Sequence, residues 1–205
     1  MHRHTQCRHN RRPVPPIEEE ASRRSSVQAA PRCGRSTGRC AVSASILLLY
    51  SSARGQTRRV CHTLTAPHPD IELVELTPDP PAWPGQYEAV LFASPTYGQG
   101  GLHHVWTTHL PQLVEAFTPS PPRLGGLLVL GDQRYHARTF AGAVTAFKPY
   151  LRGTALAPLL DRICVLDPRQ DKAWEQRCAS WVEAIIQDSR GATDDHDRFD
   201  RSPGG

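Results

Sequence analysis

Hydroxyl side chains gather directly after one apolar stretch of the chain. Residues 46–50 read Ile-Leu-Leu-Leu-Tyr and are followed by Ser51, Ser52, Gly55 and Thr57. The apolar run predicts a buried strand, and the spacing of apolar residues beyond it predicts a helix. A strand, a loop and a helix in this order direct free backbone N–H groups and the positive helix end toward the loop, where hydroxyls add neutral donors. This chemistry suits a phosphate monoester, although Ser/Gly/Thr turns after strands are also common without a ligand.

The elements that must position this loop alternate along residues 45–188. Predicted strands cover residues 46–50, 71–76, 89–94, 125–130 and 160–166. Predicted helices cover residues 57–64, 102–117, 140–151 and 171–187. Four prolines between residues 77 and 86 predict that a helix there is short or missing. This order favours one α/β domain, with a parallel sheet that helices cover on both faces.

Ligands of such sheets bind beyond the carboxyl ends of the strands. This rule selects three loops that each follow a predicted strand, at residues 51–57, 95–102 and 131–139. The second loop begins Pro-Thr-Tyr and is rich in glycine, and the third begins Gly-Asp-Gln. We therefore expect the three loops to share one ligand site.

On these motifs the chain resembles the flavodoxins, single-domain proteins that bind FMN noncovalently. The resemblance covers about residues 45–188 and rests on these motifs: Ser52-x-x-Gly55-x-Thr57, Pro95-Thr96-Tyr97-Gly98 with Leu102 and Trp106 beyond it, Gly131-Asp132-Gln133, and Trp181-Val182. It implies a flavodoxin-like, doubly wound five-stranded parallel sheet in the order 2-1-3-4-5. It also implies a monomeric electron carrier with FMN as cofactor, no substrate of its own, and a reductase donor and an acceptor enzyme as partners.

The resemblance assigns FMN binding to all three loops. The cofactor-binding residues that it implies are Ser51, Ser52, Ala53, Arg54, Gly55, Gln56, Thr57, Pro95, Thr96, Tyr97, Gly98, Gln99, Gly100, Gly131, Asp132, Gln133, Tyr135 and His136. The first loop would hold the phosphate, and Tyr97 and Tyr135 would sandwich the flavin ring by stacking. A different alignment gives the second stacking role to His136, but the flat face of a Tyr favours Tyr135. No catalytic residue and no metal ligand is predicted.

Individual roles can be assigned to three of these residues, Arg54, Asp132 and Gly98. Arg54 is the loop arginine expected near the phosphate, whereas Arg58 and Arg59 are expected to point to solvent. Asp132 is expected to fix its own loop through side-chain to backbone hydrogen bonds. In flavodoxins, a peptide of the second loop turns over when the flavin gains one electron, and Gly98 stands at the matching position. Because glycine tolerates positive φ, we expect the Gly98-Gln99 peptide to stabilise a neutral semiquinone.

The charges near these loops depart from the flavodoxin pattern, in which carboxylates surround the flavin. The three loops hold one acid, Asp132, and these basic side chains: Arg54, Arg134, Arg138, His103 and His104. Fewer anions near the ring make an anionic hydroquinone less costly, so we expect a low-potential couple less negative than is typical of flavodoxins. The basic partners that flavodoxins usually meet are correspondingly in doubt.

Three other functions remain open at this point. A flavodoxin-like activator of the dimanganese ribonucleotide reductase has a similar second loop, which Gly98-Gln99-Gly100-Gly101 favours, although the third loop and the ending near Trp181 are closer to flavodoxins. A flavodoxin-fold, FMN-dependent NAD(P)H:quinone reductase would use a nicotinamide, for which the chain shows no additional segment. The fourth possibility is a flavin-free member of the fold that serves as an interaction module.

The chain ends differ from the central domain in charge. Residues 1–44 hold nine Arg and three Glu, residues 45–190 have no net charge, and residues 191–205 have a net charge of −2. The basic segment has no aromatic residue to stack a base, which argues against nucleic-acid binding. Its composition predicts disorder, as for residues 189–205, and its apolar runs are too short for a membrane span. A second interpretation is that residues 1–44 come from a misplaced start, since Met1 is the only Met.

The cysteines and histidines give no metal-site spacing. Cys61, Cys164 and Cys178 lie in apolar contexts without a CxxC motif, which predicts buried thiols in a reducing compartment such as the cytoplasm. His103-His104 and His109 lack the i, i+4 spacing of a zinc site on a helix, so a solvated helix face is expected.

Overall fold

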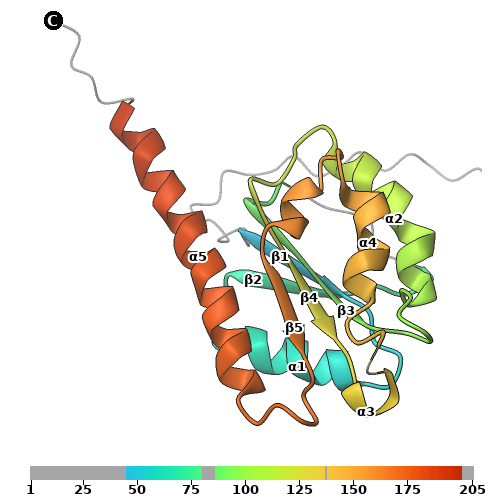
Figure 1. Cartoon of the computed structure of the whole chain (residues 1–205). Helices are drawn as coiled ribbons and strands as arrows, with labels where there is room; N and C mark the ends of the chain where they lie inside the picture. The colour runs from blue at the N-terminus through green and yellow to red at the C-terminus, as the bar shows by residue number, and fades with distance from the viewer. Residues whose placement is uncertain (1–44, 80–85, 137, 200–205) are drawn as a thin grey trace, which may run out of the picture. The chain divides into compact units, whose positions relative to one another are not determined.

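The computed structural model describes residues 45–79, 86–136 and 138–199 (Figure 1). The predictions for residues 1–44 and 200–205, and for the proline-rich residues 80–85, lie outside this range. The stacking role predicted for Tyr135 or His136 also falls on side chains outside the described part.

Five strands form one parallel sheet in the order β2-β1-β3-β4-β5, which confirms the predicted doubly wound α/β fold. The strands are β1 (Ile46–Tyr50), β2 (Ile71–Glu75), β3 (Ala89–Pro95), β4 (Leu124–Leu130) and β5 (Ile163–Leu166). Every residue of β1 and β4 is buried, because both faces of the sheet are covered. Their continuous apolar runs, without polar alternation, reflect their position as interior strands of the sheet.

Helices lie on both faces of the sheet (Figure 1). They are α1 (Gln56–Thr65), α2 (His104–Phe117), α3 (Gln133–His136), α4 (Ala143–Leu151) and α5 (Trp174–Phe199), with a 3₁₀ turn, η1, at Ala157–Leu160. Val60 of α1 and Val182 of α5 pack into one core with inward residues of the sheet. Trp106 of α2 and Phe147 of α4 pack into the other, where the Trp106 ring lies 4.6 Å from that of Phe92. No helix of the described residues is long and apolar enough to cross a membrane.

Four elements begin later than predicted: α2 by two residues, and α4, β5 and α5 by three. For α4 and β5, tertiary contacts override the apolar pattern. The predicted helix from residue 140 begins at Ala143, since Phe140 instead covers Gly131: a Cβ at that glycine would lie 2.5 Å from the Phe140 ring. The predicted strand from residue 160 begins at Ile163, since η1 precedes it. The η1 backbone packs so closely on Gly125 that a Cβ there would lie 2.4 Å from the Leu159 nitrogen.

The last helix extends beyond its predicted end. The structure places residues 189–199 in α5, where the sequence predicts a disordered tail. The helix packs against the domain as far as Ser189, which is 4% exposed. Each residue added to a formed helix gains one backbone hydrogen bond, so the helix can continue beyond this point. The three cysteines of the domain, Cys61, Cys164 and Cys178, are free and buried, as predicted.

Candidate functional site

The loop from β1 to α1 turns sharply at Gly55. This residue has φ 79°, and no atom lies within 4 Å of the position that its Cβ would take. Glycine adopts this conformation at low cost, and the first N–H groups of a helix have no partner within the helix. The N-cap of α1 is Gly55, and the hydroxyl of Ser52 in the preceding loop accepts the N–H of Arg58 at 3.3 Å, which pairs one N–H of the first turn. An open space thus faces a helix end that carries backbone donors.

Two predicted phosphate ligands of this loop lie deeper than expected. Ser51 and Thr57 are 0% and 1% exposed, so the solvent-accessible part of the loop consists of residues 52–56. The Ser51 hydroxyl and the Gln56 side-chain amide nitrogen are enclosed and have no hydrogen-bond partner in the described part of the chain. Buried polar atoms in proteins are nearly always paired. The two unpaired atoms at this loop therefore fit a polar ligand such as phosphate.

An ion pair behind the loop joins α1 to β2. The guanidinium of Arg58 donates to both carboxylate oxygens of Glu75, at 2.7 and 2.8 Å, and the Tyr50 hydroxyl donates to the same carboxylate at 3.2 Å. The expectation that Arg58 points to solvent is therefore wrong in part, because its charge serves to neutralise Glu75. Arg59 lies over the Trp174 ring, with its Cζ 5.7 Å from the ring centroid, and Arg54 is exposed.

The loop from β3 to α2 closes into a small turn. Tyr97 and Gly101 exchange two backbone hydrogen bonds, at 2.9 and 2.8 Å, and Gly98 and Gly100 between them have φ 53° and 97°. No atom lies within 4 Å of the Cβ position of Gly98. The positive φ expected at Gly98 is thus present. This turn also accounts for the start of α2 at His104 rather than at residue 102.

Tyr97 presents an aromatic face to solvent on this turn. Its side chain is 55% exposed, and its ring meets the His103 ring edge-on at a centroid distance of 5.7 Å. Burial, together with the neighbouring His104, lowers the pKa of His103. An exposed tyrosine beside an open glycine turn can stack against a flat ligand. The buried Thr96 hydroxyl at the base of the turn has no partner among the described residues.

The loop after β4 is held by carboxylates. Asp132 accepts the backbone N–H of Arg134 at 3.2 Å and its guanidinium at 2.7 Å. These hydrogen bonds from Arg134 hold the pKa of Asp132 below its usual value. Asp132 therefore fixes its own loop, as predicted, and is not placed for acid–base work.

Asp167 is a supporting residue that the sequence did not identify. It follows β5 directly, is 4% exposed, and accepts the N–H of Gln133 at 3.0 Å and that of Arg169 at 3.1 Å. Its carboxylate joins the end of β5 to the start of α3. Its position directly after a predicted strand is the sequence feature from which this residue could have been identified.

The three predicted loops meet at one edge of the sheet. The Ser51 N–H donates to the Ala93 carbonyl at 3.1 Å, and the Thr96 N–H donates to the Leu130 carbonyl at 2.6 Å. The second loop also touches the segment before α4, since a Cβ on Gly142 would lie 2.6 Å from the Gly100 Cα. The arrangement confirms that the loops share the carboxyl edge, near α3 in Figure 1.

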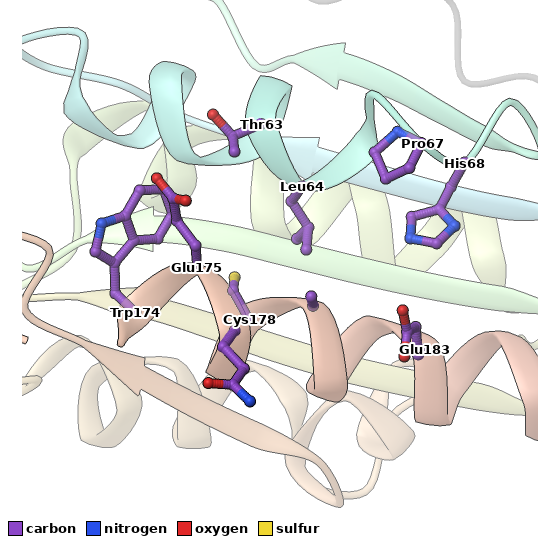
Figure 2. A pocket seen from close by; sticks show the side chains of 10 residues that line it. Thr63, Leu64, Pro67, His68, Trp174, Glu175, Cys178 and Glu183 are labelled. Atoms are coloured by element: carbon purple, nitrogen blue, oxygen red, sulfur yellow. The ribbon is translucent and has the colours of Figure 1, made fainter. Parts of the chain in front are cut away.

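A separate groove of about 340 Å³ lies between α1 and α5 (Figure 2). It is lined by Thr63, Leu64, Pro67, His68, Trp174, Glu175, Gln176, Cys178, Ala179 and Glu183. None of the predicted binding residues lines this groove, and the N-terminus of α1, with its free N–H groups, lies at the first loop instead. We therefore assign the candidate site to the three loops.

The histidines of α2 do not form a metal site. Within the described residues, no group of three or more His, Cys, Asp or Glu side chains could hold a metal ion. The expectation that His109 lies on a solvated face is wrong: it is 3% exposed, and its Nδ1 lies 3.3 Å from the Gln112 amide oxygen. Its i, i+4 relation to Val105 and Leu113 places it on the buried face of α2.

Solved structures with a similar fold include flavodoxins. The Fusobacterium nucleatum flavodoxin bound to flavin mononucleotide matches with a TM-score of 0.54 at 16% identity, over 70% of this chain and 97% of that chain. Oxidised flavodoxin 1 from Bacillus cereus matches with a TM-score of 0.50 at 15% identity, over 69% of this chain and 97% of that chain. At these identities the likeness shows the flavodoxin fold. No protein-family model and no curated protein matches the sequence.

Proposed function

We propose that this protein binds FMN noncovalently at the carboxyl edge of its sheet and carries single electrons between partner proteins. The observation that carries the proposal is Tyr97, 55% exposed on a turn whose Gly98 has φ 53° and open space beside it. This aromatic face stands at the same sheet edge as a helix N-terminus with unpaired polar atoms. FMN has a flat ring at one end and a phosphate at the other, joined by a ribityl chain. The Fusobacterium nucleatum flavodoxin, with the same fold, is bound to this molecule.

The loops would divide FMN between them. The backbone N–H groups at the start of α1, with the Ser52 hydroxyl and the Gln56 amide, would hold the phosphate, since each donates to an anion. Tyr97 would stack on the ring, and the backbone of residues 98–101 would meet its polar edge. FMN supplies the one-electron redox chemistry when bound.

The chain itself contributes a turn with one movable part. The two hydrogen bonds between Tyr97 and Gly101 hold the base of the turn. Gly98 at the tip has no atom within 4 Å of its Cβ position, so its peptide has room to change orientation. Because glycine adopts both signs of φ, such a change costs little. The turn can therefore offer either a carbonyl or an N–H to a neighbouring ring.

Reconstitution with FMN tests this function. We expect a yellow protein with one FMN per chain and quenched flavin fluorescence. Photoreduction should pass through a long-wavelength-absorbing, one-electron-reduced flavin. A protein that stays colourless, or that passes directly to the two-electron-reduced flavin, would contradict the proposal.

A second candidate is the flavodoxin-like activator of the dimanganese ribonucleotide reductase, whose glycine-rich second loop is similar to Gly98-Gln99-Gly100-Gly101. Stopped-flow mixing of the reduced protein with O₂, with and without the reductase subunit, separates the two. An electron carrier should react with O₂ independently of that subunit.

An electron carrier should also be inert toward NAD(P)H. Steady oxidation of NAD(P)H in the presence of a quinone would instead indicate a quinone reductase.

A further inference from the structure

We propose that Glu75 sets the affinity of the first loop for phosphate, because it holds the guanidinium of Arg58 away from that loop. Glu75 is a positioning residue in this role, since it acts through Arg58. The inference rests on the proposed function, because it concerns the loop to which the phosphate of FMN is assigned. It gives a residue of β2, outside the three loops, a role in cofactor affinity.

Arg58 lies next to the donors assigned to the phosphate. It belongs to the first turn of α1, and its N–H donates to the Ser52 hydroxyl at 3.3 Å. It directly follows Thr57, and the first turn of α1 holds no acidic residue. Arginine forms paired, charge-assisted hydrogen bonds with phosphate. A guanidinium that starts at this position would therefore be expected to turn toward the phosphate.

The guanidinium of Arg58 is instead bound to Glu75. Its Nε donates to Oε2 of Glu75 at 3.2 Å, and its Nη2 donates to Oε1 and Oε2 at 2.7 and 2.8 Å. The hydroxyl of Tyr50 donates to the same Oε2 at 3.2 Å. Tyr50 ends β1 and is 3% exposed, and burial raises its pKa, so the hydroxyl stays protonated at neutral pH. A buried donor and the guanidinium thus hold the carboxylate in place.

This pairing leaves the first loop with one charged side chain. Among residues 51–57, Arg54 carries a charge and the other six side chains are neutral. Arg59 lies over an aromatic ring of α5. Arg58 would therefore be a second positive charge beside the phosphate, and Glu75 cancels it. Every other charged group is common to the variants compared below, so differences between them report this pair.

The pair between Glu75 and Arg58 can be broken without loss of the fold. The two side chains are 27% and 53% exposed. Exposed ion pairs contribute little to stability, because water and salt screen them. A released guanidinium, in contrast, would add charge-assisted hydrogen bonds to the donors that the helix end already provides. Removal of the Glu75 charge should therefore change phosphate affinity more than stability.

Glu75→Gln tests the inference, because the amide has the shape of the carboxylate and lacks its charge. FMN is titrated into the FMN-free full chain, and quenching of flavin fluorescence reports binding. We expect FMN affinity to rise about tenfold, the lower end for hydrogen bonds to a charged group. Riboflavin, which lacks the phosphate, should bind with unchanged affinity, and inorganic phosphate should compete with FMN more strongly. The gain should shrink when the ionic strength is raised from about 50 mM to about 500 mM.

Two further variants separate the charge of Glu75 from its place in the fold. Glu75→Asp keeps a carboxylate, so its FMN affinity should stay close to that of the unsubstituted protein. Asp70→Asn is the matched control, since Asp70 lies just before β2 and pairs with Arg190 at 2.8 Å. This variant also removes the acid of an exposed ion pair, but at the other end of the strand. Its FMN affinity should be unchanged.

A double-mutant cycle tests whether Glu75 acts through Arg58. In an Arg58→Gln background, Glu75→Gln releases no guanidinium and removes only the field of one carboxylate. That field is worth about threefold for unit charges about 6 Å apart in water. We therefore expect a smaller gain in FMN affinity in this background than in the unsubstituted protein.

Two results would overturn the inference. One is an FMN affinity of Glu75→Gln equal to that of the Asp70→Asn control. The other is an equal gain from Glu75→Gln in both backgrounds of the cycle, since Arg58 would then have no part in it. If the unsubstituted chain bound neither FMN nor riboflavin, the proposed function itself would have failed, so the two failures are distinguishable.

Discussion

Gly100 and Gly142 bring two loops into backbone contact, because a Cβ on Gly142 would lie 2.6 Å from the Gly100 Cα and 2.7 Å from its carbonyl oxygen. The contact joins the turn after β3 to the start of α4. It allows the Tyr97 turn to lie against the segment that follows the third loop. A side chain at either glycine would therefore separate the parts of the candidate site.

Gly142→Ala should weaken FMN binding by disturbing this contact. The added methyl group meets backbone atoms that cannot rotate away, so we expect a loss of about 1–3 kcal/mol in the free energy of unfolding. Urea denaturation and FMN titration measure the two effects. Gly191→Ala is the control, since no atom lies within 4 Å of its Cβ position and it lies within a helix. Equal behaviour of the two variants would contradict the contact.

Tyr97→Ala should lower FMN affinity by about tenfold, the size expected for loss of one stacking partner. Because the side chain is 55% exposed, the thermal midpoint of the FMN-free protein should change little. Tyr150→Ala removes another exposed tyrosine, at 36% exposure on α4, and should leave FMN affinity unchanged. If titration gave the same affinity for both variants, Tyr97 would not contact the ring.

Ser52→Ala combined with Thr57→Val should weaken FMN binding while the chain still folds. The Ser52 hydroxyl accepts the Arg58 N–H in the first turn of α1, so its loss should cost about 1 kcal/mol of stability. Thr107→Val, at an exposed threonine of α2, serves as the control. Affinity for free phosphate and for FMN should fall together in the double variant. Riboflavin, which lacks the phosphate, should bind with unaffected affinity, and unchanged FMN affinity would place the phosphate in another loop.

Asp167→Asn should destabilise the protein by about 1–3 kcal/mol, because an amide cannot accept both N–H bonds that the carboxylate receives from Gln133 and Arg169. The loss should also loosen the third loop and weaken FMN binding. Asp161→Asn, at an exposed acid after η1, is the control. Chemical denaturation of both variants gives the comparison, and equal stability would assign Asp167 no supporting role.

Asp132→Asn should lower stability in a pH-dependent way. Hydrogen bonds from Arg134 hold the pKa of Asp132 below its ordinary value of 3.8. A folded-state pKa below the unfolded one contributes stability above the unfolded pKa, which is lost as the pH falls through the folded pKa. The difference in unfolding free energy between the two proteins should thus be present at neutral pH and shrink below 3.8. A difference independent of pH would point to packing rather than charge.

The order of strands and helices along the chain, and the three loops that meet at one edge, could be predicted from the amino-acid sequence alone. Continuous apolar runs such as residues 46–50 predict strands buried on both faces, and helical periodicity identified the buried positions of α1, such as Val60 and Leu64. Each of these patterns involves residues that are close together in the sequence, so it can be recognised without knowledge of the tertiary structure. The positive φ predicted at Gly98 belongs to the same class, since local backbone geometry selects glycine.

The distant residues that support the site, in contrast, could be identified only in the folded protein. The carboxylate of Asp167 meets Gln133, 34 residues away, and Arg58 meets Glu75, 17 residues away. The same holds for Phe140, which leaves the predicted helix to cover Gly131. Such pairs depend on how the strands and their following segments are placed side by side. The periodicity of apolar residues does not predict this placement, because the placement results from the packing of elements that are far apart in sequence.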